Sequence, residues 1–406
     1  MYLSLIELEH FRNYARLELA LEPRCHVLYG RNAQGKTNLL EAIYFLVTTK
    51  SPLASSDREV IAWDADSEPI PFARARGVFQ RVSEPVEIEA TLMLEEPTDA
   101  DQNPRLRKQL RVNGVPRRAM DVLGQANAVL FMPQDIELVD GPPSVRRRYL
   151  DSMLCQIDGA YCRALAQFNH AVTQRNALLK RIRDREARPD ELGYWDQQLI
   201  GLGSRVLARR QTAVVELNAY AAQAHAALTS GEALTLTYLA SLAERDRRTE
   251  EGEALAAADP DEIAALWQSV LPSLRREEIA RGITVVGPHR DDLGFAVAGR
   301  DAAAYGSRGQ QRTAALALKK AEMQIITEAS GERPILLLDD VASELDSARC
   351  EQLLAVIQAA DQALITTTTL AALPPAITDQ AQIWRVDGGA ITPHEHGSAS
   401  LAPAGD

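Results

Sequence analysis

The sequence predicts an α/β protein with mixed sheets, flanking helices and an inserted helical lobe. Three observations support this class. The apolar run HVLY at residues 26–29 leads into a glycine-rich segment and a helical pattern, and ILLL at residues 335–338 precedes two aspartates. Between them, residues of about 144 to 280 carry apolar side chains at spacings of three and four. If both apolar runs belong to one sheet, the helical block is an insertion.

The first part of the chain, to about residue 140, is expected to be rich in strands. YLSLIELEHF and VEIEATLML alternate between apolar and polar residues, as half-buried strands do. QLRVNGVPRR contains Asn113-Gly114, a favoured two-residue hairpin turn. The pattern of TNLLEAIYFLV predicts one clear helix after Lys36.

The helical insert is expected to begin near Ser144, a plausible helix cap. Helical spacing continues through DQQLIGLGSRVLARRQTAVVELNAYAAQAHAAL and PDEIAALWQSVL, with an acidic stretch between them. Pro189, Pro260 and Pro272 interrupt the insert. It is therefore too short and too broken for a long coiled-coil arm.

Strands and helices alternate again beyond Gly282. SRGQQRTAALALKKAEMQIITEAS predicts one long helix, and PILLLDDV and QALITTTT predict buried strands. The predicted boundaries place an N-terminal part of the head at 1–143, the insert at 144–281, a C-terminal part at 282–396 and a disordered tail at 397–406.

Composition restricts the class of protein. The 406 residues are 46% hydrophobic and 25% charged, which is typical of globular proteins with two or three domains. No run of about 18 apolar residues predicts a membrane span, and Glu7, Glu9 and His10 are unlike a secretory signal. The net charge of −12 argues against a surface that coats nucleic acid all over. We expect a cytoplasmic protein without a membrane partner.

A phosphate-binding loop is predicted at Gly30–Thr37. GRNAQGKT fits G-x-x-x-x-G-K-[ST], in which backbone N–H groups curl around phosphates and glycine permits the tight points. Lys36 is expected to reach the β- and γ-phosphates, and the Thr37 hydroxyl to bind Mg²⁺. A simple glycine turn is the alternative. The residues expected to bind nucleotide are Gly30, Arg31, Asn32, Ala33, Gln34, Gly35, Lys36, Thr37 and Asn38.

Two aspartates follow the buried strand ILLL. Open α/β sheets bind their ligands at the carboxyl ends of strands, so these side chains are expected to face the same nucleotide. Asp339 would hold Mg²⁺ through water, and Asp340 would orient or deprotonate the attacking water. The alternative is that the pair only caps the next turn.

Several segments together resemble one family. They are GRNAQGKTNLLEAI, GPHRDDL, SRGQQRTAALALKKAE, LLLDDVASELD, FRNY, FMPQD and PSVRRRYLD. The set resembles the RecF family of bacterial recombination mediators, whose members are SMC-like, ABC-type ATPase heads. The matching segments extend over essentially the whole chain.

The resemblance implies further site residues. Ser307 would bind the γ-phosphate held by a second subunit, so that two ATP molecules are sandwiched in a dimer, and Asp346 would face that subunit. Gln134 would sense the γ-phosphate and Mg²⁺. Arg12 and Asn13 of FRNY would contact nucleotide. From the residues alone, Ser307 and Asp346 also fit helix caps, and Gln134 fits a polar residue after a proline.

Two departures from the general ABC pattern favour slow hydrolysis. Asp340 stands where glutamate is usual, and the usual histidine is replaced in the threonine run, by Thr367 or Thr368. The role of GPHRDDL stays open. Its histidine and arginine could contact nucleotide or a partner, and its aspartates could brace the loop.

Basic residues near the Asn113-Gly114 turn form the leading candidate for a DNA-phosphate patch, because several would share one face of the hairpin. Taken singly, each basic run is more often an ordinary exposed face than a binding site. No basic run is interleaved with aromatic residues, which favours duplex DNA over single strands. The expected DNA-binding residues are Arg105, Lys108, Arg111, Arg117 and Arg118.

The function implied is ATP- and Mg²⁺-dependent homodimerisation on duplex DNA near gaps or junctions, with weak, DNA-dependent ATP hydrolysis for release. The resemblance implies RecO and RecR as partners, loading of RecA and a contribution to the SOS response. Two alternatives remain: a transporter-type nucleotide-binding subunit, and an ATP-gated DNA clamp or adaptor without meaningful turnover.

Overall fold

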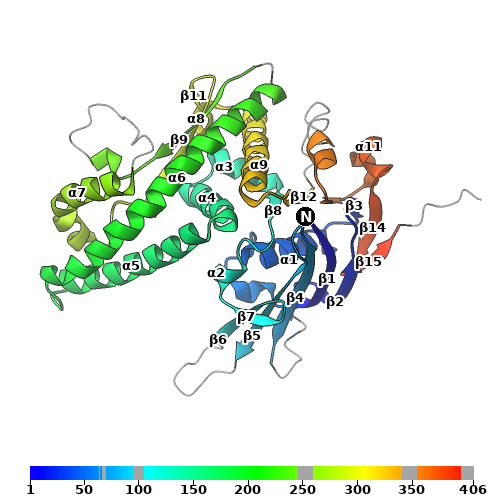
Figure 1. Cartoon of the computed structure of the whole chain (residues 1–406), viewed down its shortest axis with the longest axis horizontal. Coiled ribbons are helices and arrows are strands. Elements are labelled where there is room, and N and C mark those ends of the chain that lie inside the picture. The colour runs from blue at the N-terminus through cyan, green and yellow to red at the C-terminus, as the bar shows by residue number, and fades with distance from the viewer. Residues whose placement is uncertain are drawn as a thin grey trace, which may run out of the picture. The chain divides into compact units, whose positions relative to one another are not determined.

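The computed structural model describes residues 1–63, 65, 70–95, 105–229, 231–245, 259–340 and 354–394 (Figure 1). The chain folds as two compact units. The first comprises Met1–Pro116, Leu130–Met132 and Ile335–Asp406, and the second comprises Arg117–Val129 and Pro133–Pro334. These limits differ from the predicted boundaries at 143 and 282. The predicted tail at 397–406 lies outside the described residues.

The first unit contains a six-stranded antiparallel sheet in the order β2-β1-β4-β5-β6-β7. Burial alternates along its strands, as the sequence pattern predicts, so one face is packed and the other is only partly buried. Asn113 and Gly114 both have positive φ, at 49° and 74°, which gives the predicted tight hairpin turn. The strands are β1 (Tyr2–Phe11), β2 (Tyr14–Ala20), β4 (Phe72–Gln80), β5 (Val86–Glu95), β6 (Arg105–Val112) and β7 (Val115–Arg117).

A second six-stranded sheet has the order β15-β14-β3-β13-β12-β8. Strands β14, β3, β13 and β12 are parallel neighbours, and β15 is antiparallel to β14. Helix α1 (Lys36–Thr48) contacts strands of both sheets and is buried over most of its length. The strands are β3 (Cys25–Tyr29), β8 (Ala128–Phe131), β12 (Ile335–Asp339), β13 (Ala363–Thr367), β14 (Gln382–Asp387) and β15 (Ala390–Pro393).

The second unit is mostly helical, and the long helix α6 lies beside α5 and α9 (Figure 1). Arg175 is fully buried and bridges Asp196 on α6 and Glu278 on α7. Because α9 packs along α6, it belongs to this unit instead of the sheets of the first. The long helices are α4 (Pro143–Ile157), α5 (Gly159–Arg183), α6 (Gly193–Leu228), α7 (Pro260–Arg281) and α9 (Arg308–Ser330).

Three sequence expectations for the insert are wrong. Ser144 is not a cap, because α4 begins one residue earlier at Pro143, a proline suited to the first helical turn. Pro272 lies inside α7 without ending it. Residues 234–239 form a strand that pairs with residues 292–297, although the insert was expected to be helical. Their alternation, LTLTYL, is a signal that the helical prediction overlooked.

The remaining elements are short. A three-stranded antiparallel sheet in the second unit has the order β11-β10-β9. No helix among the described residues combines the length and hydropathy needed to cross a membrane. The short elements are η1 (Asp57–Val60), α2 (Ala119–Val122), η3 (Pro133–Ile136), α3 (Glu137–Asp140), η4 (Pro189–Leu192), β9 (Leu234–Leu239), η5 (Ala243–Arg245), β10 (Asp292–Val297), β11 (Arg300–Asp301), α8 (Ala302–Tyr305), η7 (Leu370–Ala372) and α11 (Pro375–Thr378).

Candidate nucleotide-binding site

The predicted phosphate loop and the predicted metal-side carboxylate meet at one edge of the parallel sheet. In the register of strands β3, β13 and β12, Tyr29 lies opposite Thr367, and Thr366 lies opposite Asp339. The carboxyl ends of these strands therefore present the Gly30–Thr37 loop, the threonine run and the two aspartates together. This is the edge at which open α/β sheets bind their ligands.

The loop needs glycine at both predicted positions. A Cβ atom on Gly30 would lie 2.2 Å from the carbonyl oxygen of Val386, a backbone atom that cannot yield easily. Gly35 has a φ of 112°, a conformation that side chains rarely adopt. Ala33 also has a positive φ, of 64°, which the sequence does not reveal.

Side chains of the FRNY segment support the loop. The Asn13 amide donates to the carbonyl oxygen of Gln34 at 2.9 Å and accepts from the Asn38 amide at 2.8 Å. The hydroxyl of buried Tyr14 donates to the carbonyl oxygen of Gly35 at 2.8 Å. These bonds within the chain support the backbone of the loop.

Arg12 ties the turn between β1 and β2 to helix α1. Its guanidinium donates to both carboxylate oxygens of buried Glu41, at 2.8 and 2.7 Å, and to the carbonyl oxygen of Glu59 at 2.7 Å. The structure thus gives Arg12 a bracing role. Its contact with nucleotide stays a prediction.

Lys36 folds back over the loop. Its Nζ atom donates to the carbonyl oxygens of Gly30 and Arg31, at 2.7 and 2.8 Å. Burial lowers the pKa of this amine, and the nearby carboxylates of Asp340 and Asp339 act in the opposite direction. An ammonium group held by loop carbonyls lies where it can exchange those partners for phosphate oxygens.

A hydroxyl and a carboxylate of the kind that Mg²⁺ prefers lie in direct contact. The Thr37 hydroxyl donates to Asp339, 2.8 Å from Oδ1 and 3.0 Å from Oδ2. Mg²⁺ in nucleotide sites is usually bound through one or two carboxylates together with phosphate oxygens. Thr37 and Asp339 therefore fit the predicted metal position by their chemistry and their proximity.

The threonine run contributes a contact that sequence reasoning missed. The buried Thr366 hydroxyl donates to Asp339 Oδ1 at 2.7 Å and accepts from the backbone N–H of Asp340 at 2.9 Å. Asp340 itself has a φ of 47°, in the left-handed region. The sequence predicts a strand at QALITTTT. It does not predict that this strand pairs with β12, and only that pairing places Thr366 beside Asp339.

Ser307 caps helix α9 in the second unit. Its Oγ accepts from the Gln310 N–H at 3.2 Å, and its own N–H is 3.0 Å from Gln310 Oε1, which completes a capping box. Ser307 is exposed. Gln134 is exposed in η3, which contacts α9 in the same unit. Asp346 lies outside the described residues.

Comparisons with known proteins agree with this geometry. Residues 2–388 match the model of the RecF/RecN/SMC N-terminal domain. A protein of Chloroflexus aggregans, the DNA replication and repair protein RecF, is 43% identical and covers 96% of this chain and 99% of its own length. The chain belongs to the RecF family.

Solved structures of RecF show the same fold. The structure of the recombination mediator protein RecF-ATPrS in the RecFOR pathway aligns with a TM-score of 0.83 and 30% identity, covering 97% of this chain and 98% of that one. The RecF-ATP structure of the same pathway gives 0.81 and 31%, with the same coverage. The predicted class, an ABC-type ATPase head with mixed sheets, is confirmed.

The GPHRDDL segment of this RecF-family chain is braced by its own unit. Buried Asp291 accepts from the Tyr238 hydroxyl at 2.7 Å and the Ser241 hydroxyl at 2.6 Å. Asp292 pairs with both Nε and Nη2 of Arg146, at 2.6 and 2.7 Å. For these aspartates, the structure favours the bracing interpretation over direct contact with nucleotide.

The predicted DNA-binding residues do not all share one face. Arg105 and Arg111 lie on the exposed face of β6, and no ion pair or hydrogen bond holds either side chain within the described residues. Lys108 points to the other face, because strand residues alternate. Its ammonium pairs with Asp57 at 2.9 Å and lies 4.5 Å from the centre of the Phe45 ring. Lys108 is therefore not among the several basic residues that share the exposed face of this strand.

Arg117 and Arg118 are exposed at and just beyond the end of β7, and neither has a polar partner within the described part of the chain. Strand β7 is the neighbour of β6 in the sheet. Free guanidinium groups are thus available at this edge. Whether they contact DNA stays a prediction.

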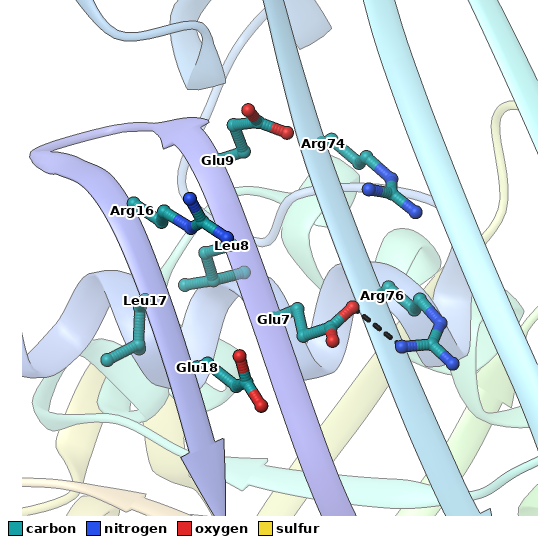
Figure 2. A pocket seen from close by; sticks show the side chains of 8 residues that line it. All are labelled: Glu7, Leu8, Glu9, Arg16, Leu17, Glu18, Arg74 and Arg76. Atoms are coloured by element: carbon teal, nitrogen blue, oxygen red, sulfur yellow. Dashed lines mark hydrogen bonds and ion pairs between the residues drawn. The ribbon is translucent and has the colours of Figure 1, made fainter.

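The middle of the same sheet carries balanced charge. A hollow of about 310 Å³ lies over strands β1, β2 and β4. Figure 2 shows acidic side chains of β1 and arginines of β4 facing one another there. Arg76 bridges Glu7 and Glu87 at 2.7 and 2.6 Å, and Arg74 pairs with Glu89 at 2.8 Å. These paired arginines are less available for phosphate. The lining residues are Glu7, Leu8, Glu9, Arg16, Leu17, Glu18, Arg74 and Arg76.

Proposed function

We propose that this RecF-family chain binds ATP and Mg²⁺ at the Gly30–Thr37 loop, closes into a homodimer on duplex DNA, and hydrolyses ATP slowly to release it. One observation carries the proposal: the loop, the Thr37 hydroxyl and the Asp339 carboxylate meet at one sheet edge. The match to RecF-ATP, a RecF in complex with ATP, supports the choice of nucleotide.

The loop residues bind and orient the triphosphate. N–H groups of the loop and the start of α1 point at its phosphates, and Lys36 exchanges its loop carbonyls for phosphate oxygens. Thr37 and Asp339 hold the metal site, with Gln134 as a further candidate. A bound Mg²⁺ ion neutralises charge on the β- and γ-phosphates.

Asp340 is the candidate base. It follows the metal-side aspartate at the end of β12, and its backbone is in the left-handed region, with a φ of 47°. Its side chain is one methylene shorter than the glutamate usual at this position, so the reach to a water molecule is less favourable. The shorter reach supports the proposal of weak hydrolysis, and we propose that duplex DNA stimulates it. A slow ATPase acts as a timed clamp.

Dimer closure uses Ser307. The capping box employs its oxygen as an acceptor, so its hydroxyl hydrogen is available to donate to a γ-phosphate held by a second copy. The start of α9 adds a favourable field for an anion. Asp346 would face that second copy.

Duplex DNA near gaps or junctions is the proposed nucleic-acid ligand. Free arginines at the β6–β7 edge would neutralise backbone phosphates with little base reading. Arg105, Arg111, Arg117 and Arg118 are the candidates, and Lys108 would support the strand from its other face. RecO and RecR are the proposed partners, with RecA loading and the SOS response as the cellular outcome in the cytoplasm.

Sedimentation velocity tests the proposal. The protein is run with ATP, with ADP and without nucleotide, each with and without a gapped duplex, in Mg²⁺. We expect a dimer only with ATP, and co-sedimentation with DNA to be strongest in that state. A monomer under all six conditions would contradict the proposal.

A transporter-type subunit no longer competes, because the chain matches RecF proteins over nearly its full length. A measurement of phosphate release distinguishes the proposed ATPase from a clamp or adaptor without turnover. Release of phosphate that rises on addition of duplex DNA supports the ATPase. ATP-dependent DNA binding without any phosphate release would favour the adaptor.

A further inference from the structure

Thr366 lies between the two aspartates of the candidate site. It is fully buried in β13, directly opposite Asp339 in the parallel pairing of β12 and β13. Its hydroxyl oxygen is 2.7 Å from Asp339 Oδ1 and 2.9 Å from the backbone nitrogen of Asp340. One side chain thus contacts both residues assigned to the metal and the attacking water.

The direction of these two bonds follows from the chemistry. The Asp340 N–H can only donate, so the Thr366 oxygen accepts from it. The single hydroxyl hydrogen of Thr366 is then free for Asp339, whose ionised carboxylate can only accept. A bond from a hydroxyl to a charged carboxylate is stronger than one between neutral groups.

We propose that Thr366 is a positioning residue for the metal-side carboxylate, which its hydroxyl orients for Mg²⁺ while it holds the Asp340 backbone in place. The inference rests on the proposed function, because it requires that Asp339 faces the ion. Neither the phosphate-loop pattern nor the pair of aspartates assigns a role to this threonine.

Two features explain why such a residue is needed. Asp339 Oδ1 accepts from both Thr366 and Thr37, so rotation of the carboxylate is restricted and Oδ2 keeps a defined direction. Asp340 has a φ of 47°, which is unfavourable for a residue with a side chain. The bond to Thr366 helps to offset that cost at the position where the candidate base must be aimed.

The test uses two variants that separate the hydroxyl from the methyl group. Thr366→Val keeps the shape and the branched side chain but removes the hydroxyl, and Thr366→Ser keeps the hydroxyl. Binding of a fluorescent ATP analogue is measured as Mg²⁺ is raised from zero. For Thr366→Val we expect unchanged binding without metal and a Mg²⁺ midpoint raised roughly tenfold or more. Thr366→Ser should retain the wild-type midpoint.

Thr48→Val is the matched control. Thr48 is also a buried threonine of the first unit, but its hydroxyl bonds only the carbonyl oxygens of Tyr44 and Lys50, at 2.8 and 3.0 Å. This variant should lower the midpoint of urea unfolding by an amount similar to that of Thr366→Val. It should leave the Mg²⁺ midpoint unchanged.

Each result decides between the alternatives. An unshifted Mg²⁺ midpoint in folded Thr366→Val overturns the inference, as does an equal shift in Thr366→Ser, which would indicate packing. If Thr366→Val does not fold, Thr366→Ala replaces it. Equal Mg²⁺ midpoints for Thr366→Ala and Thr366→Ser would then overturn the inference. A wild-type protein whose ATP binding ignores Mg²⁺ would instead overturn the proposed function, and this inference with it.

Discussion

At Gly30, a Cβ atom would lie 2.2 Å from the carbonyl oxygen of Val386 in strand β14. At Gly35, the same atom would lie 2.7 Å from the Asn13 amide, and φ is 112°. Gly389 is a third such position, because a Cβ there would lie 2.4 Å from the carbonyl oxygen of Asn13. The lack of a side chain at these three glycines allows the nucleotide loop, the FRNY turn and the β14–β15 turn to pack closely against one another.

Gly30→Ala should therefore displace the backbone of the nucleotide loop, because the added methyl group would clash with the Val386 carbonyl oxygen. Overpacking of this kind costs about 1–3 kcal/mol, and about 1.4 kcal/mol corresponds to a tenfold change in affinity. We expect ATP binding, measured by calorimetry, to weaken roughly tenfold or more, with a lower unfolding temperature.

Gly201→Ala is the control for that experiment. Gly201 lies in α6, and a Cβ there would meet no atom within 4 Å. Alanine favours the helix over glycine by about 0.5–1 kcal/mol, so this variant should be as stable as the wild type or more so. Wild-type ATP affinity in Gly30→Ala would refute the steric argument.

At the scale of elements, the loop between α7 and β10 connects the helices of the second unit. Fully buried Arg210 of α6 pairs with Asp151 of α4 at 2.7 Å and donates to the carbonyl oxygen of Pro288 at 2.6 Å. Asp291 and Asp292 add bonds to β9 and α4. The GPHRDDL segment therefore bonds to three elements, α4, α6 and β9, through its carbonyl and carboxylate groups.

His289 in this loop makes stability depend on pH. Burial lowers its pKa to about 4, and the charges of Arg290, Arg147 and Arg210 act in the same direction. The unfolded chain binds this proton near pH 6.5, whereas the folded chain does so only near pH 4. Folding is therefore favoured by neutral His289 above pH 6.5, and that contribution is lost as pH falls toward 4.

Urea unfolding at pH 7, 6 and 5 measures this effect. The loss should approach about 2 kcal/mol by pH 5, since each pKa unit corresponds to about 1.4 kcal/mol. His289→Gln removes the titrating group and should flatten the difference between pH 7 and pH 5. The carboxylates titrate equally in both proteins, so identical pH profiles would assign the loss to them and not to His289.

At the scale of the whole molecule, the proposed cycle joins ATP binding, dimer closure and DNA binding. The candidate residues for these steps are distributed over both units: Lys36 and Asp340 belong to the first, and Ser307 belongs to the second. The cycle is therefore tested best on the full chain, by its assembly state and its affinity for DNA.

Asp340→Asn should trap the ATP-bound dimer. The amide cannot take a proton from water, and loss of a general base typically slows a reaction about 10²–10⁴-fold. ATP binding should persist, because the loop, Thr37 and Asp339 are unchanged. We expect sedimentation with ATP and Mg²⁺ to show a dimer that lasts longer than in the wild type. Unchanged phosphate release would show that another residue is the base.

Replacing Arg105 and Arg111 with glutamine should weaken DNA binding without changing sequence preference. Each lost phosphate contact lowers the slope of log K against log salt by about 0.9, so the double variant should lose up to about 1.8. Fluorescence anisotropy with labelled duplex at several salt concentrations measures the slope.

Arg24→Gln provides the comparison for this surface. Arg24 is also an exposed arginine of the first unit, but Glu22 already pairs with it at 2.5 Å. Its removal should leave the salt slope unchanged. Equal slopes for the wild type and the Arg105/Arg111 variant would place DNA binding elsewhere on the molecule.

The sequence by itself determined the features that depend on local pattern. The Gly30–Thr37 loop, helix α1, the Asn113-Gly114 hairpin and the Ser307 cap all appear where spacing and residue type predict them. Their positions follow from local residue types and spacing, although distant side chains such as Asn13 and Tyr14 also support the Gly30–Thr37 loop. The match to the RecF family follows from the same segments.

Tertiary structure decided the rest. Strands β3, β13 and β12 come from distant parts of the chain, and only their pairing brings Thr366 beside Asp339. The ion pair of Lys108 with Asp57, the bracing of GPHRDDL and the left-handed backbone of Asp340 likewise depend on neighbours far away in sequence. Local periodicity carries no information about which distant groups will meet, so these contacts had to be seen in three dimensions.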